Sequence, residues 1–151
     1  MDVENFLREK AIVFEKKSKS RTYLIVNEEA LVEGHFDIVA YFTLGLKVLK
    51  ISNSISKTLI KKLDGLYKNI QETPVYLIGQ LGKNDAFENL IAGQEIIEYA
   101  LSIISKSFQY VGGRIILVEC NDDDKLLTFY KENNFLFLQQ PDLVQMVKFL
   151  P

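Results

Sequence analysis

Residues 75–138 read VYLIGQLGKNDAFENLIAGQEIIEYALSIISKSFQYVGGRIILVECNDDDKLLTFYKENNFLFL, and this stretch decides the fold of the 151-residue chain. It predicts a strand, a polar loop, a long helix, a second strand, a short helix and a third strand. The first apolar run, 75–81, leads into a loop that opens the helix at about Ala92. Residues 91–108 then repeat apolar side chains at helical spacing. Residues 114–119 form an apolar run of strand length, as expected of a buried strand.

The rest of the chain predicts further helices and strands around this stretch. Residue Gly45 lies inside a long strand, where we expect a bend or a bulge. Gly65 is expected to break or end a helix that begins with Ser52 or Ser54 as its N-cap. The predicted elements are a helix at 3–17, strands at 22–26 and 38–48 joined by a polar connection, a helix within 52–70, and strands at 135–138 and 144–150. Together they predict a single α/β (α+β) domain that spans residues 1–151.

Composition narrows the classes of protein to which the chain can belong. A net charge of −2 and a pI of about 5.5 argue mildly against a nucleic-acid-binding domain, which is usually basic. No apolar stretch approaches the length of a membrane span, so we expect no membrane association. The N-terminal residues MDVENFLREK carry charges where a signal peptide would be apolar. With a single cysteine, Cys120, these features predict a soluble cytoplasmic protein.

Several common catalytic signatures are missing from the sequence. It has no cysteine–histidine cluster for a metal, no GxxxxGK[ST] phosphate loop and no GxGxxG, and we expect no metal. The only histidine, His35, falls in a predicted turn and is best explained as a surface residue. Residues Asp122, Asp123 and Asp124 resemble a cation site, but carboxylates at a helix start more often cap that helix.

The loop from Gly82 to Gly93 is the strongest candidate for a binding site. It joins a strand to the start of the long helix, where unpaired backbone N–H groups and the helix dipole favour an anion such as pyrophosphate. The loop contains only two glycines. From the loop alone, an ordinary strand-to-helix connection is the better interpretation.

Three segments give the chain a resemblance to the GNAT family of N-acetyltransferases. They are LIGQLGKND (77–85), VGGRIILVEC (111–120) and LLTFYKENNF (126–135), which stand in the family's order of central strand, pyrophosphate loop, long helix, strand and FY-x-x-x-G-F-like segment. Upstream, FLREKA, SRTYLIV and IVAYFTLGL resemble the toxin-like branch of the family. The resemblance covers nearly the whole chain. It implies the GNAT acyl-CoA N-acyltransferase fold, with a twisted, mixed and mostly antiparallel sheet flanked by helices.

The resemblance also implies an activity and a set of site residues. Acetyl would pass from acetyl-CoA, as cosubstrate, to a primary amine by direct attack on the thioester. Tyr130 matches the tyrosine that donates a proton to the departing CoA thiolate. Acetyl-CoA would be bound by residues Leu81, Gly82, Lys83, Asn89, Leu90, Ile91, Ala92 and Gly93. The general base is left open among Glu119, Glu33, His35 and water.

The sequence departs from the family pattern at several positions. Glu88 stands where the family has Gln or Arg, and Asn89 and Ile91 replace glycine-type positions, so the pyrophosphate loop is degenerate. Asn134 replaces the later glycine, a mild change because asparagine tolerates left-handed backbone. Asp123 stands at the usual asparagine position. The family's first strand would precede Val3, so we expect it to be truncated or lost.

Two alternatives to a general N-acetyltransferase remain open at this point. One is a catalytically impaired GNAT-fold module that binds or regulates a partner, which the degenerate loop supports. The other is a toxin-like enzyme acting on aminoacyl-tRNA. The acidic pI speaks against tRNA as a partner, whereas the KKSKSR run (16–21) and the lysines of the predicted helix within 52–70 speak for it. A homodimer is compatible with the resemblance, and the acceptor amine is not identified.

Overall fold

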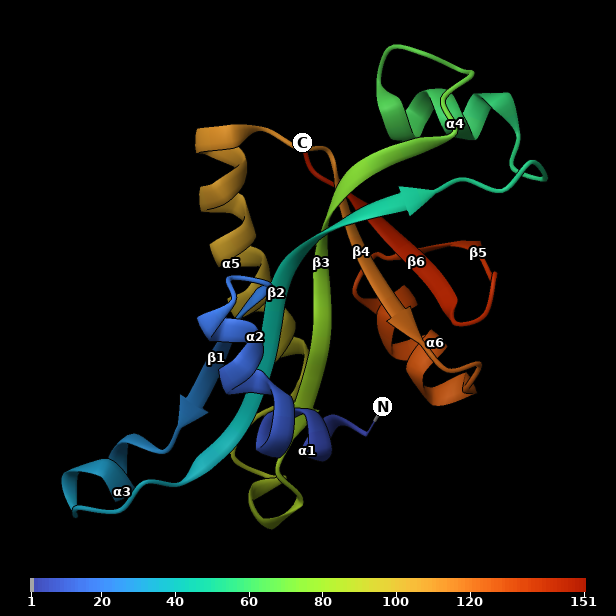
Figure 1. The fold of residues 1–151 in the computed structure, drawn as a ribbon. Coiled ribbons are helices and arrows are strands. Elements are labelled where there is room, and N and C mark those ends of the chain that lie inside the picture. The colour runs from blue at the N-terminus through green and yellow to red at the C-terminus, as the bar shows by residue number, and fades with distance from the viewer. Residues whose placement is uncertain (1) are drawn as a thin grey trace. The chain divides into compact units, whose positions relative to one another are not determined.

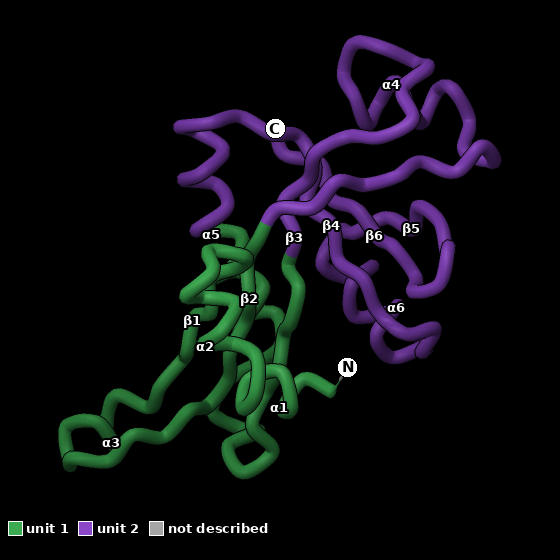
Figure 2. The backbone as a smooth tube through the Cα atoms, in the orientation of Figure 1, with its two compact units in different colours: residues 1–45, 78–102 green, residues 46–77, 103–151 purple. Residues whose placement is uncertain are grey.

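The computed structural model describes residues 2–151 (Figure 1). These residues form two compact units, which are described one at a time (Figure 2). Unit 1 comprises Met1–Gly45 and Ile78–Ser102, and unit 2 comprises Leu46–Leu77 and Ile103–Pro151. Of the helices within residues 2–151, none has the length and apolarity needed to cross a membrane.

Six strands form a sheet in the order β1-β2-β3-β4-β6-β5. Their bounds are β1 (Ser20–Val26), β2 (Ile38–Lys50), β3 (Glu72–Lys83), β4 (Ile115–Cys120), β5 (Leu136–Gln139) and β6 (Val144–Phe149). The β1–β2, β4–β6 and β5–β6 pairs are antiparallel. The predicted α/β class with a mostly antiparallel sheet is confirmed.

Unit 1 begins with a helical segment that is interrupted by one wider turn. It consists of α1 (Val3–Asn5), the π-helical turn η1 (Phe6–Lys10) and α2 (Ala11–Lys16), where one helix was predicted over 3–17. Phe6 and Ala11 pack on Tyr41 of β2 to form a small apolar core. The polar connection between β1 and β2 contains a short helix, α3 (Glu28–Val32), which the sequence patterns did not predict. Asn27 caps it by accepting a hydrogen bond from the Glu29 amide.

The β1–β2 pair has its register shift at the end away from Gly45, and the bend or bulge expected near Gly45 stays a prediction. Gly45 pairs regularly with Ser20, and the register shifts between Ile25 and Val26 at the other end. The rest of unit 1 consists of the end of β3, the 3-10 turn η2 (Asp85–Phe87) and the first half of α5 (Gly93–Val111).

Unit 2 is built around the antiparallel β4–β6 pair. Its core contains Leu49, Leu63, Val75, Ile115, Leu117, Leu138 and Val147, all buried. The helix predicted within 52–70 is shorter, α4 (Lys57–Asp64), and Ser56 is its N-cap rather than Ser52 or Ser54. Gly65, with φ +90°, ends the helix as predicted. Leu66, which follows this helix end, is exposed.

The short helix of unit 2, α6 (Asp124–Glu132), starts as expected from its aspartates. The Asp123 carboxylate accepts a hydrogen bond from the Leu126 amide at 3.0 Å, so Asp123 is the N-cap. After the helix, Asn134 adopts a left-handed conformation with φ +68°. The asparagine therefore takes the backbone conformation for which the family pattern has glycine.

Candidate functional site

In unit 1, the end of β3 and the loop after it are held in place by Asn84. Its side-chain amide donates to the Ile38 carbonyl at 2.9 Å, and its carbonyl oxygen accepts from the Ala86 amide at 3.0 Å. Its backbone amide donates to the Val39 carbonyl at 2.8 Å. The bonds to Ile38 and Val39 tie the loop to the start of β2, and the bond from Ala86 lies within the loop, so the path of the chain after β3 is fixed.

The predicted acyl-CoA-binding residues all fall in this part of unit 1. Residues Leu81, Gly82 and Lys83 end β3, Asn89 to Ala92 form the loop, and Gly93 is the first residue of α5. Ile91 is only 6% exposed, so its side chain packs inward. Asn89, Leu90 and Ala92 are exposed, as is Glu88. Burial of Ile91 leaves the outer surface of the loop free of the bulky group that replaced a glycine.

The start of α5 offers backbone donors to an anion. The N–H groups of Gly93 and Gln94 lie in the first helical turn, where no carbonyl of the same helix can accept from them. Their partial positive charge adds to that of the helix dipole. The residues present therefore fit the pyrophosphate of CoA. Among the predicted acyl-CoA-binding residues, Lys83 at the end of β3 is the one with a positively charged side chain, and this side chain is exposed.

Glu95, in the first turn of α5, is not among the residues predicted for the binding site. Its carboxylate accepts a hydrogen bond from the Ala92 amide at 3.1 Å. One backbone donor of the predicted anion site is thus occupied by a negative side chain of the protein itself. The sequence signal was present, because a glutamate three residues into a helix is half of a capping box.

Gly82 is required by close packing within unit 1. A Cβ at this position would overlap the Val3 side chain and lie 3.0 Å from the Tyr41 ring. The same residues line a cavity of about 720 Å³, together with Arg8, Lys83 and other side chains of α1, β2 and the β3 end. The Tyr41 hydroxyl donates to the Val3 carbonyl. Burial, with a smaller effect of Asp2, raises the pKa of Tyr41 to about 12.

In unit 2, α6 presents Tyr130 from its buried side. The side chain is 7% exposed, and its ring lies 5.6 Å from Phe135 and 5.2 Å from Phe129, measured between centroids. Burial, and secondarily the nearby Cys120, raises the pKa of Tyr130 to about 12. Like an ordinary tyrosine, Tyr130 is protonated at neutral pH, but the raised pKa makes its hydroxyl a weaker proton donor.

Glu119, one of the candidate bases, belongs to a hydrogen-bonded network in unit 2. Its two carboxylate oxygens accept from the Lys47 ammonium at 2.5 Å and from the Gln145 amide at 3.0 Å. Gln139 extends the network by donating to Gln145 and to the Lys50 carbonyl, both at 2.7 Å. These partners contact both oxygens of the Glu119 carboxylate. The other candidates, Glu33 and His35, are exposed in unit 1.

The described residues, 2–151, contain no group of three or more His, Cys, Asp or Glu side chains arranged for a metal ion. Cys120 is a buried free thiol. Its pKa is raised by burial and by the nearby Asp122 and Asp123.

Comparison with solved structures finds the same fold in bacterial toxins. AtaT in complex with acetyl-methionyl-tRNAfMet has a TM-score of 0.75 at 19% sequence identity, and the alignment covers 97% of this chain and 79% of AtaT. A tyrosine-to-phenylalanine variant of KacT has a TM-score of 0.75 at 18% identity, with 96% and 79% covered. The AtaT toxin bound to acetyl-CoA and the C-terminus of the antitoxin AtaR has a TM-score of 0.73 at 15% identity, with 97% and 78% covered.

These likenesses confirm the predicted GNAT fold. No protein-family profile matches the sequence, and no curated protein matches it either.

Proposed function

We propose that this chain is an acetyl-CoA-dependent N-acetyltransferase whose acceptor is the amine of an aminoacyl-tRNA. The observation that carries the proposal is the fold, shared over 97% of the chain with AtaT in complex with acetyl-methionyl-tRNAfMet. The start of α5 supports it independently, since its first-turn backbone N–H groups can bind an anion. The single domain predicted for residues 1–151 is part of this proposal, as is its cytoplasmic location.

Binding of acetyl-CoA is assigned to backbone groups more than to side chains. The pyrophosphate accepts hydrogen bonds from the amides of Gly93 and Gln94, in the manner of other anions at helix starts, while the Ala92 amide donates to Glu95. Backbone amides of Leu81, Gly82 and Lys83 bind the pantetheine and polarise the thioester carbonyl. Backbone N–H groups can donate these hydrogen bonds whatever the side chains of the loop are, provided that the backbone keeps this path. For this reason the replacement of glycines by Asn89 and Ile91 is compatible with binding.

Acetyl transfer then needs one proton donor and one proton acceptor. The neutral amine nitrogen attacks the carbonyl carbon, a C–N bond forms, and the C–S bond breaks with its electron pair on sulfur. The Tyr130 hydroxyl donates a hydrogen bond and then its proton to that sulfur. Since a pKa of about 12 lies above that of a typical thiol, about 8.5, the full proton transfer is completed only as water restores the tyrosine. The proton lost by the amine leaves through water or an exposed carboxylate.

The first prediction concerns acetyl-CoA binding and turnover. Saturating acetyl-CoA should raise the melting temperature by about 5 °C, because a ligand that binds only the folded state stabilises it. Incubation with radiolabelled acetyl-CoA and a pool of aminoacyl-tRNA should transfer label to the amino-acid moiety. Tyr130→Phe should lower kcat by roughly 100-fold and leave the thermal shift unchanged. Tyr110→Phe, which alters an exposed tyrosine of α5, is the matched control.

The outcomes separate the enzyme from the alternative of a non-catalytic binding module. A thermal shift without any transfer to amines would favour the module. No shift even at millimolar acetyl-CoA would refute both acetyl-CoA binding and the enzyme. Transfer to small primary amines or peptides, but not to aminoacyl-tRNA, would keep the acetyltransferase and replace its acceptor.

A further inference from the structure

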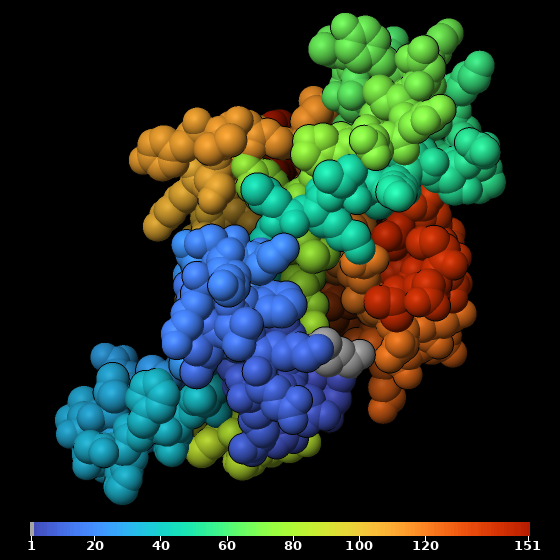
Figure 3. All heavy atoms as spheres, in the orientation of Figure 1, coloured from blue at the N-terminus to red at the C-terminus, as the bar shows by residue number. Residues whose placement is uncertain are grey.

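The α4 segment, residues 52–71 between β2 and β3, has a charge opposite to that of the whole chain. It contains four lysines and one acidic residue, Asp64, which gives it a charge of +3 in a protein whose net charge is −2. In the space-filling view the segment, coloured green, projects its side chains into solvent (Figure 3). A concentration of one sign of charge on a surface segment attracts a ligand of the opposite sign.

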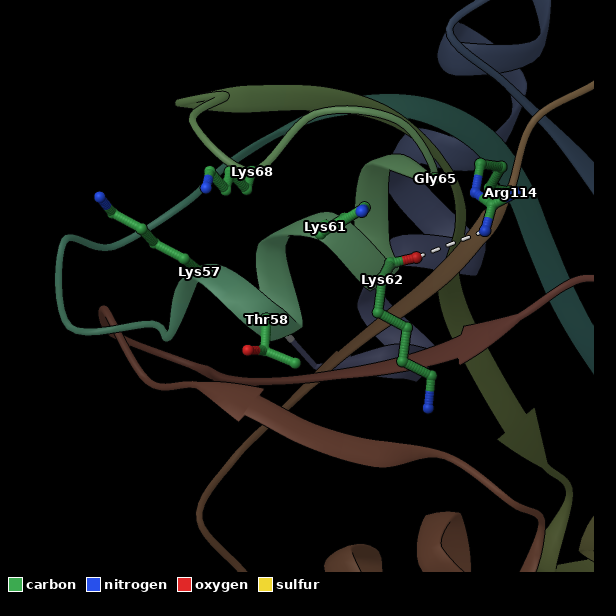
Figure 4. A pocket seen from close by; sticks show the side chains of 7 residues that line it. All are labelled: Lys57, Thr58, Lys61, Lys62, Gly65, Lys68 and Arg114. Atoms are coloured by element: carbon green, nitrogen blue, oxygen red, sulfur yellow. Dashed lines mark hydrogen bonds between the residues drawn. The ribbon is translucent and has the colours of Figure 1, made fainter.

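The basic side chains of the segment surround a pocket of about 540 Å³ in unit 2. Figure 4 shows Lys57 and Lys68 at one end of α4. Arg114 lies at the other end, beyond Gly65, and Lys61 lies on the helix between the two ends. All four side chains are exposed. The pocket therefore presents a row of cations along the length of a helix.

Arg114 is held in this row by the shape of the turn that ends α4. Its guanidinium lies directly over Gly65, where a Cβ would come within 2.7 Å of the guanidinium carbon. It also points toward the Lys62 carbonyl, with a nitrogen–oxygen distance of 3.4 Å. The carbonyl groups at a helix C-terminus carry partial negative charge, which favours a cation there. Gly65 thus admits a positive group that any larger residue would displace.

The charges in the row are available to a ligand. Among the described residues of unit 2, the ion pair that is present joins Lys47 to Glu119. In the same residues, no ion pair joins an acidic side chain to Lys57, Lys61, Lys68 or Arg114. The carboxylate of Asp64 instead accepts from the backbone amides of Leu66 and Tyr67, at 3.1 and 2.7 Å. Lys62 is engaged differently, with its ammonium 4.8 Å from the centre of the Phe149 ring.

An exposed aromatic residue, Tyr67, directly precedes Lys68 of the basic row in the sequence. Tyr67 is 63% exposed, although an aromatic ring normally gains by burial, and the Asp64 carboxylate orders the turn that carries it. Exposed aromatics among cations are the arrangement with which proteins bind nucleic acid, since bases stack on the ring while lysines contact phosphates. A lone phosphate would engage one or two of these cations, whereas a polynucleotide backbone can engage them all.

We propose that the α4 segment and Arg114 bind the phosphate backbone of the tRNA substrate. The inference extends the proposed function, because it assigns the surface that holds the body of the acceptor. The other basic run, KKSKSR in unit 1, is less suited to binding a polyanion, because its Arg21 is already paired with Glu15 at 3.2 Å.

The experiment compares two triple variants of the full chain. Lys57→Ala/Lys61→Ala/Lys68→Ala removes three cations from the α4 row, and Lys16→Ala/Lys17→Ala/Lys19→Ala removes three exposed lysines from the other run. Binding of a fluorescently labelled tRNA is measured by anisotropy between about 0.05 and 0.2 M salt. The α4 variant should bind at least about tenfold more weakly, and its log–log salt slope should fall by about 3. The matched control should stay within about twofold of the unaltered chain.

Further measurements fix the meaning of each result. Lys57→Arg/Lys61→Arg/Lys68→Arg keeps the charges and should keep the tRNA affinity, and loss of binding in this variant would contradict the proposal. Equal tRNA binding by the alanine variant and the unaltered chain would also overturn it. Poly-glutamate of similar charge should compete at least about tenfold less well than tRNA, and equal competition would assign the row to an acidic protein instead. The thermal shift caused by acetyl-CoA should be the same in all variants as in the unaltered chain. It tests the proposed function separately, so failure of the acetyltransferase proposal can be distinguished from failure of the tRNA-binding proposal.

Discussion

Glu95 and Tyr130 show how single residues set the conditions for the proposed chemistry. Glu95 caps the amide of Ala92 at the start of α5, where the proposal places the CoA pyrophosphate. A carboxylate there stabilises the unliganded helix but repels an incoming anion. Tyr130 is shielded from water, which raises its pKa to about 12 and makes its hydroxyl a weaker proton donor. One residue therefore opposes binding of the cosubstrate, and the other can donate a hydrogen bond to the departing thiolate but holds its proton more tightly than an exposed tyrosine.

Removing the charge of Glu95 should strengthen acetyl-CoA binding. Glu95→Gln keeps a side chain that can accept from the Ala92 amide but removes the repulsion, so we expect a dissociation constant about three- to tenfold lower. Isothermal titration calorimetry with acetyl-CoA measures the change. Glu98→Gln, on the same helix one turn later and hydrogen-bonded to Gln94, is the control and should leave the constant unchanged. Equal or weaker binding by Glu95→Gln would place the pyrophosphate elsewhere.

At the scale of elements, two short helices of unit 2 depend on the residues at their ends. α4 begins at the Ser56 cap and ends at Gly65, and this length brings its lysines and Arg114 into one row. α6 begins at the Asp123 cap, and its nine residues place Tyr130 on the buried side. A helix of this length has little stability of its own, so its cap contributes a large share.

Loss of the α6 cap should destabilise the protein by about 1 kcal/mol. Asp123→Ala removes the acceptor for the Leu126 amide, whereas Asp123→Asn retains one and should cost a few tenths of a kcal/mol at most. Urea denaturation followed by circular dichroism gives the free energies of unfolding. Asp122→Ala removes a neighbouring exposed aspartate that does not cap the helix and is the matched control. Equal effects of Asp122→Ala and Asp123→Ala would show that charge, rather than the cap, sets the stability of this helix.

At the scale of the whole molecule, each unit buries one tyrosine hydroxyl. Tyr41 in unit 1 and Tyr130 in unit 2 both have a pKa of about 12, with burial as the main cause. In the unfolded chain a tyrosine titrates near pH 10. Between about pH 10 and 12 the unfolded chain therefore binds fewer protons than the folded one, and the free energy of unfolding falls as pH rises. Below about pH 10 both states hold these protons and the effect vanishes.

Because the two tyrosines have raised pKa values in the folded protein, we expect the free energy of unfolding to fall in alkaline solution. Replacing both tyrosines by phenylalanine should reduce this fall. The double variant Tyr41→Phe/Tyr130→Phe should lose less unfolding free energy than the unaltered chain between about pH 9 and pH 11. The difference is at most about 1.4 kcal/mol per pH unit for each tyrosine. Urea denaturation at the two pH values measures it, and comparing slopes cancels both the deprotonation of lysines and the lower starting stability of the variant. Parallel slopes would mean that the buried hydroxyls ionise as they do in the unfolded chain.

Local patterns in the sequence determined the class of fold and most of its elements. Apolar periodicity predicted every strand and the long helix, because those signals come from neighbours within a few residues of one another. The end of α4 at Gly65 and a cap among the three aspartates 122–124 followed from residue chemistry, whereas the left-handed Asn134 was expected from the glycine at that position of the family pattern. The helix α3 and the Ser56 cap were missed. Their signals are equally local, but other polar residues nearby fitted the same roles.

Only the tertiary structure decided which side chains meet. Lys47 and Glu119 are 72 residues apart in sequence, and Arg114 reaches the end of α4 across 52 residues. It also decided that Ile91 points inward and that Tyr130 is buried, which raises its pKa. Burial and pairing depend on distant segments that a local pattern does not contain. The stretch 75–138 thus sufficed to predict the fold. The row of cations around α4 and the burial of Tyr130 became visible only in the folded chain.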